Sequence, residues 1–231
     1  MHKSSLLRME WFVEKYLMTV TTKVSASISV LDIGSSDVNG SYRHLFPSPR
    51  FSYVGLDMVK GKNVDIVPKL PYDWSEIRDS SYDVVISGQC FEHVEFPWIL
   101  FEEIARIVKP NGLICIITPR LQARHRYPVD TYRYDSDGML AMAKYVNFKP
   151  EHVSCNEAPI KAPGSWFSHF GDCMLVARKP KDWAGILDVR KYNYVPWPMN
   201  KLSGNFVNEE NHPSFIRSIA NLFRFSKTKN D

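Results

Sequence analysis

The sequence has no apolar run that approaches the roughly 18 to 20 residues needed to span a bilayer. Its first segment, Met1–Val20, is interrupted by charged side chains, among them Arg8, Glu10 and Lys15. This pattern predicts an amphipathic helix and not a secretory signal, whose apolar stretch would be continuous. We therefore expect a cytoplasmic protein.

Paired cysteines are also missing. The four cysteines lie far apart in the sequence, without a C-x-x-C pair or a histidine at ligand spacing: Cys90, Cys115, Cys155 and Cys173. This distribution predicts neither a disulfide nor a structural zinc site, and we expect no metal. Cys115 and Cys173 fall in apolar segments and are predicted to be small buried hydrophobic residues.

The charge has no strong excess of either sign. The chain has 29 Lys and Arg against 25 Asp and Glu, a net charge of +4. Nucleic-acid-binding domains usually carry a denser basic stripe, so this composition argues against a nucleic-acid partner.

What the sequence does contain is an alternation of strand and helix patterns. The predicted strands are short β-rich apolar runs between turn residues: Ser29–Ile33, Phe51–Leu56, Val64–Val67, Tyr82–Ser87, Leu113–Thr118 and Asp172–Ala177. Pro97–Val108 and Asp135–Tyr145 have helical spacing, and Pro110–Gly112 should end the first of these helices. Such alternation predicts an α/β domain whose parallel sheet has helices on both faces.

The character of the sequence changes after residue 180. We divide the chain into a domain of residues 1–180 and an extension of residues 181–231. Val195–Pro198 contains two prolines and predicts an extended arm, whereas Pro213–Phe225 has an apolar stripe typical of a helix. That helix could pack on its own domain, join two copies into a homodimer, or lie on an anionic membrane surface.

The first predicted strand ends in an acidic residue and a glycine, Asp32 and Gly34. Ligands of open α/β sheets bind outside the carboxyl ends of the strands, beside this first turn. The dinucleotide fingerprint G-x-G-x-x-G is absent, because Ser36 stands where its second glycine should be. Since that glycine makes room for a pyrophosphate, its absence argues against NAD and FAD. An acidic residue here suits a cationic ligand better.

The second predicted strand also ends in a carboxylate, Asp57. An acidic residue at this place can accept hydrogen bonds from both hydroxyls of a ribose. Either aspartate alone could be a turn-forming or capping residue. Both together at neighbouring strand ends favour ligand binding.

These motifs, in this order, resemble those of class I S-adenosylmethionine-dependent methyltransferases, especially the bacterial type-11 group. The resemblance covers Ile28 to about Lys179 and rests on Leu31–Gly34, Asn39–Ser41, Gly55–Asp57, Tyr82–Ser87, Phe91–Val94 and Ile107–Leu113. It implies a Rossmann-like fold with a mostly parallel seven-stranded sheet and an antiparallel last pair. The N-terminal helix should cover the sheet near the cofactor.

The resemblance also implies S-adenosyl-L-methionine as cofactor and a set of residues that bind it. Asp32, Gly34 and Ser35 would surround the methionine part. Asp57 would bind the ribose, Met58 would lie against adenine, and Asp65 would border the adenine edge. Ser87, Gly88 and Gln89 would line the region of the methyl group.

His93 is the candidate general base, because an imidazole titrates near neutral pH and this loop should face the acceptor. The alternative is that His93 donates a hydrogen bond to backbone and braces the loop. Glu92 is predicted to be structural.

The segment after the fifth strand combines aromatic, basic and acidic residues, which suits a polar, ring-shaped acceptor such as a sugar. The candidate substrate residues are His125, Arg126, Tyr127, Asp130, Tyr132 and Arg133. Alternatively, Arg126 or Arg133 forms an ion pair with Asp130, and the segment is a lid whose polar groups bind one another and not a substrate.

We therefore expect methyl transfer to an oxygen or nitrogen of a small polar acceptor, with a sugar or glycan precursor of surface-polysaccharide pathways preferred by resemblance. The sequence has neither the Asn/Asp-Pro-Pro-Tyr/Phe tetrapeptide nor the Pro-Cys nucleophile of nucleic-acid methyltransferases, which disfavours nucleic acid as the acceptor. Two alternatives stay open: a non-catalytic scaffold that binds the cofactor, and an NAD(P)-dependent oxidoreductase on a similar fold.

Overall fold

The computed structural model describes residues 3–18, 27–155, 158–159 and 169–192. Its strands are β1 Ile28–Ile33, β2 Phe51–Leu56, β3 Tyr82–Gly88, β4 Val108–Leu121, β5 Lys149–Cys155, β6 Ala158–Pro159 and β7 His169–Arg178. Six of them form a continuous sheet in the order β2-β1-β3-β4-β7-β5, and the short β6 pairs with β7. Neighbouring strands from β2 to β4 are parallel, and β7 is antiparallel to β4, β5 and β6. The predicted α/β fold with a mostly parallel sheet and an antiparallel final pairing is confirmed.

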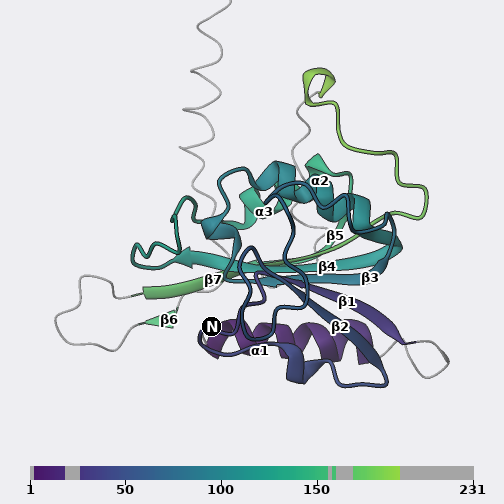
Figure 1. The fold of residues 1–231 in the computed structure, drawn as a ribbon. Helices are drawn as coiled ribbons and strands as arrows, with labels where there is room; N and C mark the ends of the chain where they lie inside the picture. The colour runs from purple at the N-terminus through teal and green to yellow at the C-terminus, as the bar shows by residue number, and fades with distance from the viewer. Residues whose placement is uncertain (1–2, 19–26, 156–157, 160–168, 193–231) are drawn as a thin grey trace, which may run out of the picture.

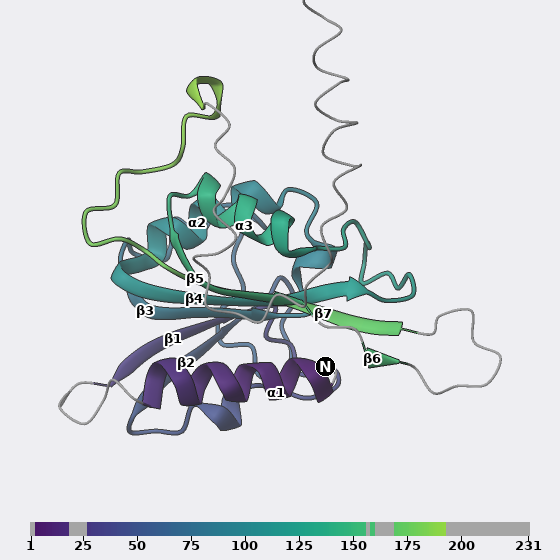
Figure 2. The same ribbon diagram turned by 180° about the vertical axis from the view of Figure 1, so that it is seen from behind.

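Helices cover both faces of this sheet (Figures 1 and 2). α2 (Pro97–Ile107) and α3 (Ser136–Tyr145) lie on one face, and α1 (Lys3–Phe12), which continues as a π-helix over Val13–Met18, lies on the other. Each face has its own apolar core. Phe101 and Ile104 are buried in the core under α2, and Met9 and Phe12 are buried in the core under α1.

Local sequence explains where two of these helices begin. Pro97 occupies the first turn of α2, where its missing N–H costs no hydrogen bond. Asp135 caps α3 by accepting a hydrogen bond of 2.7 Å from the backbone N–H of Ser136. The predicted stop at Pro110–Gly112, however, lies within β4, because α2 already ends at Ile107 and Val108 has extended backbone angles.

One predicted strand is wrong and another was not predicted. Of the run Val64–Val67, only Ile66 pairs with the sheet, through an isolated parallel bridge to Leu56. The backbone N–H groups of Asp65 and Ile66 both donate to the Gly55 carbonyl, and the Ile66 carbonyl accepts from Asp57, so the segment meets the end of β2 without forming a ladder. β5, by contrast, was not predicted, because Lys149–Cys155 contains Pro150, Glu151 and His152 among few apolar residues.

The expectation of no disulfide is also wrong. Cys155 and Cys173 are direct cross-strand partners on β5 and β7, and the structure joins them by a disulfide. Cys173 is buried as predicted, but it is not a free thiol. Their separation of 18 residues has no local spacing signal, and the pairing becomes visible only once β5 is known to lie beside β7. Cys115 is free and buried, as predicted.

Part of the predicted extension lies outside the described residues. This applies to the arm at Val195–Pro198, to the helix at Pro213–Phe225, and to the homodimer or membrane contact proposed for that helix. Within the described ranges, no helix has both the length and the apolar character to cross a membrane.

Candidate functional site

The carboxyl ends of β1, β2 and β3 lie next to one another, as the sequence predicts. Ile33 pairs with Leu56 on one side and with Ser87 on the other. The backbone N–H groups of Gly34 and Ser35 donate to the Leu56 carbonyl, and the Ser87 hydroxyl donates to the Ile33 carbonyl at 2.9 Å. The predicted cofactor residues on these three strands therefore form one continuous edge.

Gly34 is required at this edge for two reasons that the structure makes explicit. Its φ of +74° is rarely adopted by residues with a Cβ. A Cβ built on Gly34 would also lie 2.6 Å from the side chain of Cys90. The glycine thus permits close packing of the protein on itself, in addition to the close ligand approach expected from sequence. Gly88 has a similar role, because its Cβ would overlap the Tyr42 hydroxyl.

Asp57 ties the glycine loop to the tip of β2. Its Oδ2 accepts a hydrogen bond of 3.0 Å from the backbone N–H of Ser36, the residue that replaces the second glycine. Asp57 is only half-buried, so its carboxylate stays accessible to a ligand. Beside it, Met58 is an apolar side chain that is 58% exposed. An accessible carboxylate next to an exposed apolar side chain fits the ribose and adenine of S-adenosylmethionine.

Asp32 is buried on the β1 tip and accepts a hydrogen bond from the Tyr53 hydroxyl. Burial, only partly offset by that hydrogen bond and by the positive charge of Arg43, raises the pKa of Asp32 to about 7. Tyr53 was not among the predicted site residues, because a tyrosine in an apolar strand has no distinguishing sequence signal.

The raised pKa of Asp32 predicts a pH-dependent stability. A carboxyl with a higher pKa in the folded state binds its proton more tightly there, so the free energy of unfolding falls as pH rises from about 4 to 7. Asp32→Asn should therefore raise this free energy by about 1–2 kcal/mol at pH 8 and change it little at pH 4. Urea unfolding at both pH values measures this, and equal effects at the two pH values would contradict it.

Asp65, the residue predicted to border the adenine edge, binds other groups of the protein. Its carboxylate accepts the Gly55 N–H at 2.8 Å and pairs with Arg43. It also lines a cavity of about 670 Å³ together with Arg43 and Lys62, whereas the other predicted cofactor residues do not. This open cavity lies on the Arg43 side of the glycine loop. We expect the cofactor at the strand tips, and the role of Asp65 at the adenine edge stays a prediction.

The N-terminal helix reaches the same edge. Ser4 donates to Asp172, whose other oxygen accepts a hydrogen bond of 3.0 Å from Gln89. Ser5 lies 2.5 Å from the Tyr42 hydroxyl, the group that packs on Gly88. The Gln89 side-chain oxygen is buried without a hydrogen-bond partner. Such an unsatisfied acceptor beside the predicted methyl region is consistent with a polar ligand there.

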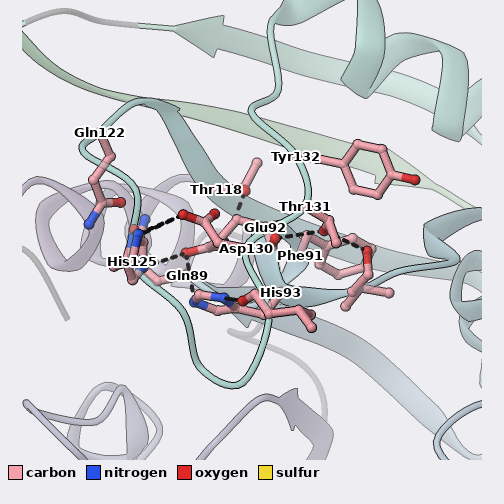
Figure 3. Close-up of polar contacts among 12 residues, drawn as sticks. Gln89, Phe91, Glu92, His93, Thr118, Gln122, His125, Asp130, Thr131 and Tyr132 are labelled. Carbon is pink, nitrogen blue, oxygen red and sulfur yellow. Dashed lines mark hydrogen bonds and ion pairs between the residues drawn. The ribbon is translucent and has the colours of Figure 1, made fainter.

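Next to this edge, a second group of polar side chains converges (Figure 3). Glu92 and His93 belong to a short 3-10 helix after β3, and His125 comes from the loop after β4. His93 Nε2 lies 3.8 Å and His125 Nε2 lies 4.0 Å from Glu92 Oε1. The two imidazole rings are perpendicular with centroids 4.8 Å apart. We call these three residues the Glu-His-His cluster.

Backbone carbonyls determine which ring nitrogens carry protons. His93 Nδ1 lies 2.6 Å from the Val129 carbonyl, and His125 Nδ1 lies 3.2 Å from the Ala123 carbonyl. Since a carbonyl oxygen only accepts, each Nδ1 carries the hydrogen, and each neutral imidazole has its lone pair on Nε2. His93 thus braces the loop, as the alternative predicted. Its Nε2 atom keeps a lone pair that can accept a proton or bind a cation.

Burial changes the titration of this cluster. It raises the pKa of the fully buried Glu92 to about 7, although the Thr118 hydroxyl donates to the carboxylate. It lowers the pKa of His93 below its usual value, which favours the neutral imidazole. Glu92, predicted to be structural, is therefore part of the site.

The loop with the predicted substrate residues is held by its own ion pair. Arg133 binds both carboxylate oxygens of Asp130, and this partner lowers the pKa of Asp130 well below its usual range. Asp130 Oδ2 also accepts the His125 backbone N–H at 2.6 Å. The ion pair within the loop that the alternative predicted is present, and Arg133 is the partner of Asp130.

The remaining loop residues are more accessible. Tyr127 is 64% exposed and lies beside the ring of His93, Tyr132 donates to the Glu95 carbonyl at 3.1 Å, and Arg126 is exposed. Thr131 binds the Glu92 carbonyl through both its N–H and its hydroxyl, so the loop is fixed to the Glu-His-His cluster. Substrate contact by any of these residues stays a prediction.

Comparison with known proteins agrees with this architecture. Residues 31–116 match the family model of the methyltransferase domain of the type-11 group. A methyltransferase of Mycolicibacterium gilvum that carries no assigned substrate is 29% identical over 113 residues. These residues are 42% of this chain and 42% of that relative, so the match spans less than half of either protein.

Solved structures share the fold at low sequence identity. A SAM-dependent methyltransferase from Archaeoglobus fulgidus is 15% identical with a TM-score of 0.53, over 76% of this chain and 95% of its own. The [4+2]-cyclase SpnF is 14% identical with a TM-score of 0.53, over 75% of this chain and 80% of its own. That a cyclase has the same fold shows that the fold alone does not define the reaction.

The sheet order, the glycine loop and the two acidic strand tips define a fold of the class I methyltransferases, whose cofactor is S-adenosyl-L-methionine. Within this class, residues 31–116, which are less than half of the chain, are similar to the methyltransferase domain of the type-11 group.

Proposed function

We propose that this protein transfers a methyl group from S-adenosyl-L-methionine to an oxygen or nitrogen of a small polar acceptor. The observation that carries the proposal is that two different sites share one edge of the sheet. The tips of β1 and β2 present Asp32 and Asp57, and the Glu-His-His cluster begins only three residues after Gln89. The proposed cofactor-binding residues thereby lie beside a group of side chains that can accept protons.

The protein's own residues hold the cofactor and supply its electrostatic environment. Asp57 would accept hydrogen bonds from the ribose hydroxyls, and Met58 would pack on the adenine. The ionised Asp32 would favour a positively charged ligand, and Ser87, Gly88 and Gln89 would border the methyl region. S-adenosylmethionine, when bound, supplies an electrophilic methyl group that is already activated, so positioning is the main task of the protein.

The acceptor oxygen or nitrogen loses a proton when its bond to the methyl carbon forms. His93 is the proposed group at this step, since its Nε2 has a free lone pair that faces Glu92 Oε1 at 3.8 Å. A general base contributes about 10²–10⁴-fold to such a reaction.

A sugar or glycan precursor is the proposed acceptor, and polysaccharide biosynthesis the proposed context. The exposed ring of Tyr127 offers a flat apolar face, and Arg126 and the half-exposed His125 offer polar groups beside it. The net charge of +4 is mild and does not indicate the dense basic surface that nucleic acid requires.

Calorimetric titration of the full chain with S-adenosylmethionine, S-adenosylhomocysteine and NADH tests the cofactor. We expect both sulfur nucleosides to bind and NADH not to bind, because the glycine loop lacks the pyrophosphate fingerprint. Binding of NADH alone would instead identify an oxidoreductase. Binding of S-adenosylmethionine without methylation of any member of a sugar, lipid and small-molecule panel would identify a non-catalytic scaffold.

A cytoplasmic location is part of the proposal, and the Cys155–Cys173 disulfide is the feature that bears on it most directly. Disulfides are rare in reducing compartments. We expect cell fractionation to recover the protein in the cytosol, where this disulfide would be an exception to that rule. Recovery of the protein from a periplasmic or secreted fraction would contradict this location.

A further inference from the structure

We propose that Glu92, His93 and His125 form a binding site for one divalent first-row transition metal ion, of which zinc is the probe we choose. The site is new relative to the sequence analysis, which predicted no metal from the scattered cysteines and did not consider these three residues as ligands. His125 follows His93 by 32 residues, and the fold brings their side chains together. The three ligand atoms all lie within 4.8 Å of one another.

The first argument is the state of Glu92. Its side chain is fully buried, and its Oε1 atom has no hydrogen-bond partner. A buried polar atom without a partner is costly, and a carboxylate oxygen is more costly than most. This oxygen faces the two histidine Nε2 atoms at 3.8 and 4.0 Å, where a cation between the three atoms would satisfy it.

The second argument is the orientation of the histidines. Metal-binding histidines usually donate their other ring N–H to a carboxylate or backbone carbonyl, which fixes the ring and directs the lone pair at the ion. His93 donates to the Val129 carbonyl, and His125 lies within hydrogen-bond distance of the Ala123 carbonyl. Both Nε2 lone pairs are thereby left for a ligand.

The third argument is the charge of the surroundings. Asp130 carries the remaining negative charge near His125, with its Oδ2 atom 3.9 Å from His125 Nδ1. Arg133 binds Asp130 through two hydrogen bonds and compensates that charge. An ionised Glu92 would then add a further negative charge among these groups, which a bound cation would compensate.

The donor set specifies the class of ion. Two imidazoles and one carboxylate are ligands of zinc and of iron(II) in proteins, whereas magnesium and calcium prefer oxygen ligands alone. In a tetrahedral zinc site, bond lengths of about 2.0–2.1 Å place ligand atoms about 3.3 Å apart. The two histidine nitrogens lie 3.8 and 4.0 Å from Glu92 Oε1, so they would move closer to it on binding the ion, and the His125 side chain is 38% exposed.

This inference deepens the proposed function and rests on it in one respect: the ion would occupy the acceptor end of the site. Three protein ligands leave at least one coordination position for a water or an acceptor oxygen. A bound cation would lower the pKa of that oxygen, and the proton would then pass to solvent. In that case His93 would hold the ion and would replace its proposed role as general base with that of a ligand.

The experiment uses the untagged full chain, stripped of metal with a chelator and titrated with zinc chloride by calorimetry. We expect one ion per chain, and we expect His125→Ala and Glu92→Gln each to weaken zinc binding at least 10-fold. His44→Ala, at an exposed histidine outside the cluster, is the matched control and should leave zinc binding unchanged. Cobalt(II) absorption provides a second readout, since visible bands of a nitrogen-containing tetrahedral site should vanish in His125→Ala.

The result that overturns the proposal is zinc binding that is absent or equally strong in His125→Ala. Because Glu92 is buried, Glu92→Gln could fail to fold, whereas His125→Ala alters a half-exposed loop residue and keeps the test decisive. S-adenosylmethionine binding to the same metal-free sample separates the two hypotheses. Intact cofactor binding and methyl transfer in a protein that binds no zinc would refute the metal site and leave the proposed function standing. Zinc binding without any cofactor binding would refute the proposed function alone.

Discussion

Replacing His93 with glutamine is expected to lower kcat for methyl transfer by about 10²–10⁴-fold. Glutamine can still donate to the Val129 carbonyl, which His93 Nδ1 contacts at 2.6 Å, so the loop keeps this brace. It cannot supply the basic Nε2 lone pair that faces Glu92 Oε1. The loss should therefore fall on kcat, whether Nε2 takes the proton of the acceptor or holds a cation that makes the acceptor more acidic. Steady-state kinetics on an acceptor found in the sugar panel measures it.

Two controls separate chemistry from structure. His44→Gln changes an exposed histidine that lies outside the Glu-His-His cluster and lines the cavity beside Arg43, and should keep full activity. The affinity of His93→Gln for S-adenosylmethionine should equal that of the unmodified protein, because His93 lies at the acceptor end. If His93→Gln keeps its kcat, His93 only braces the loop and is not a catalytic residue.

Removal of the Asp57 carboxylate has the second large expected effect. Asp57→Ala should weaken the binding of S-adenosylmethionine by about 1–3 kcal/mol, or roughly 5- to 150-fold. The half-buried carboxylate lies at the β2 tip, where it would accept the ribose hydroxyls, and no other acidic side chain ends this strand. Isothermal titration calorimetry with S-adenosylmethionine and S-adenosylhomocysteine should show the same loss for both, since they share the ribose.

The carboxylate also anchors the glycine loop through the Ser36 N–H, so this second role needs its own control. Asp57→Asn keeps an oxygen for Ser36 but loses one acceptor for the ribose, and should bind the cofactor with intermediate affinity. Asp182→Ala, at an exposed acidic residue beyond β7, should bind like the unmodified protein. Equal affinity of Asp57→Ala and Asp182→Ala would remove Asp57 from the cofactor site.

Most of the fold follows from local sequence patterns. The apolar runs of β1, β2 and β3 and the helical spacing of α2 and α3 predict these elements to within one or two residues. Their alternation then places the carboxyl ends of these three parallel strands at one edge. The proximity of the proposed cofactor residues was predictable for the same reason, because these residues follow directly after recognisable strands.

The parts that could not be predicted depend on contacts between distant segments. β5 has few apolar residues, so neither its place beside β7 nor the Cys155–Cys173 disulfide has a local signal. Val64–Val67 is β-rich, yet its N–H groups bind the Gly55 carbonyl and it forms only one bridge. The convergence of Glu92 with His125 likewise depends on how a loop of the protein folds back over the β3 tip.

A crystal structure of the protein with S-adenosylhomocysteine tests the central claim most directly. The account predicts adenosine at the tips of β1 and β2, with its ribose hydroxyls on Asp57, its adenine against Met58, and its sulfur directed toward Gln89 and the Glu-His-His cluster. Adenosine bound in the cavity beside Arg43 and Lys62, or anywhere else away from Asp32 and Asp57, would contradict it.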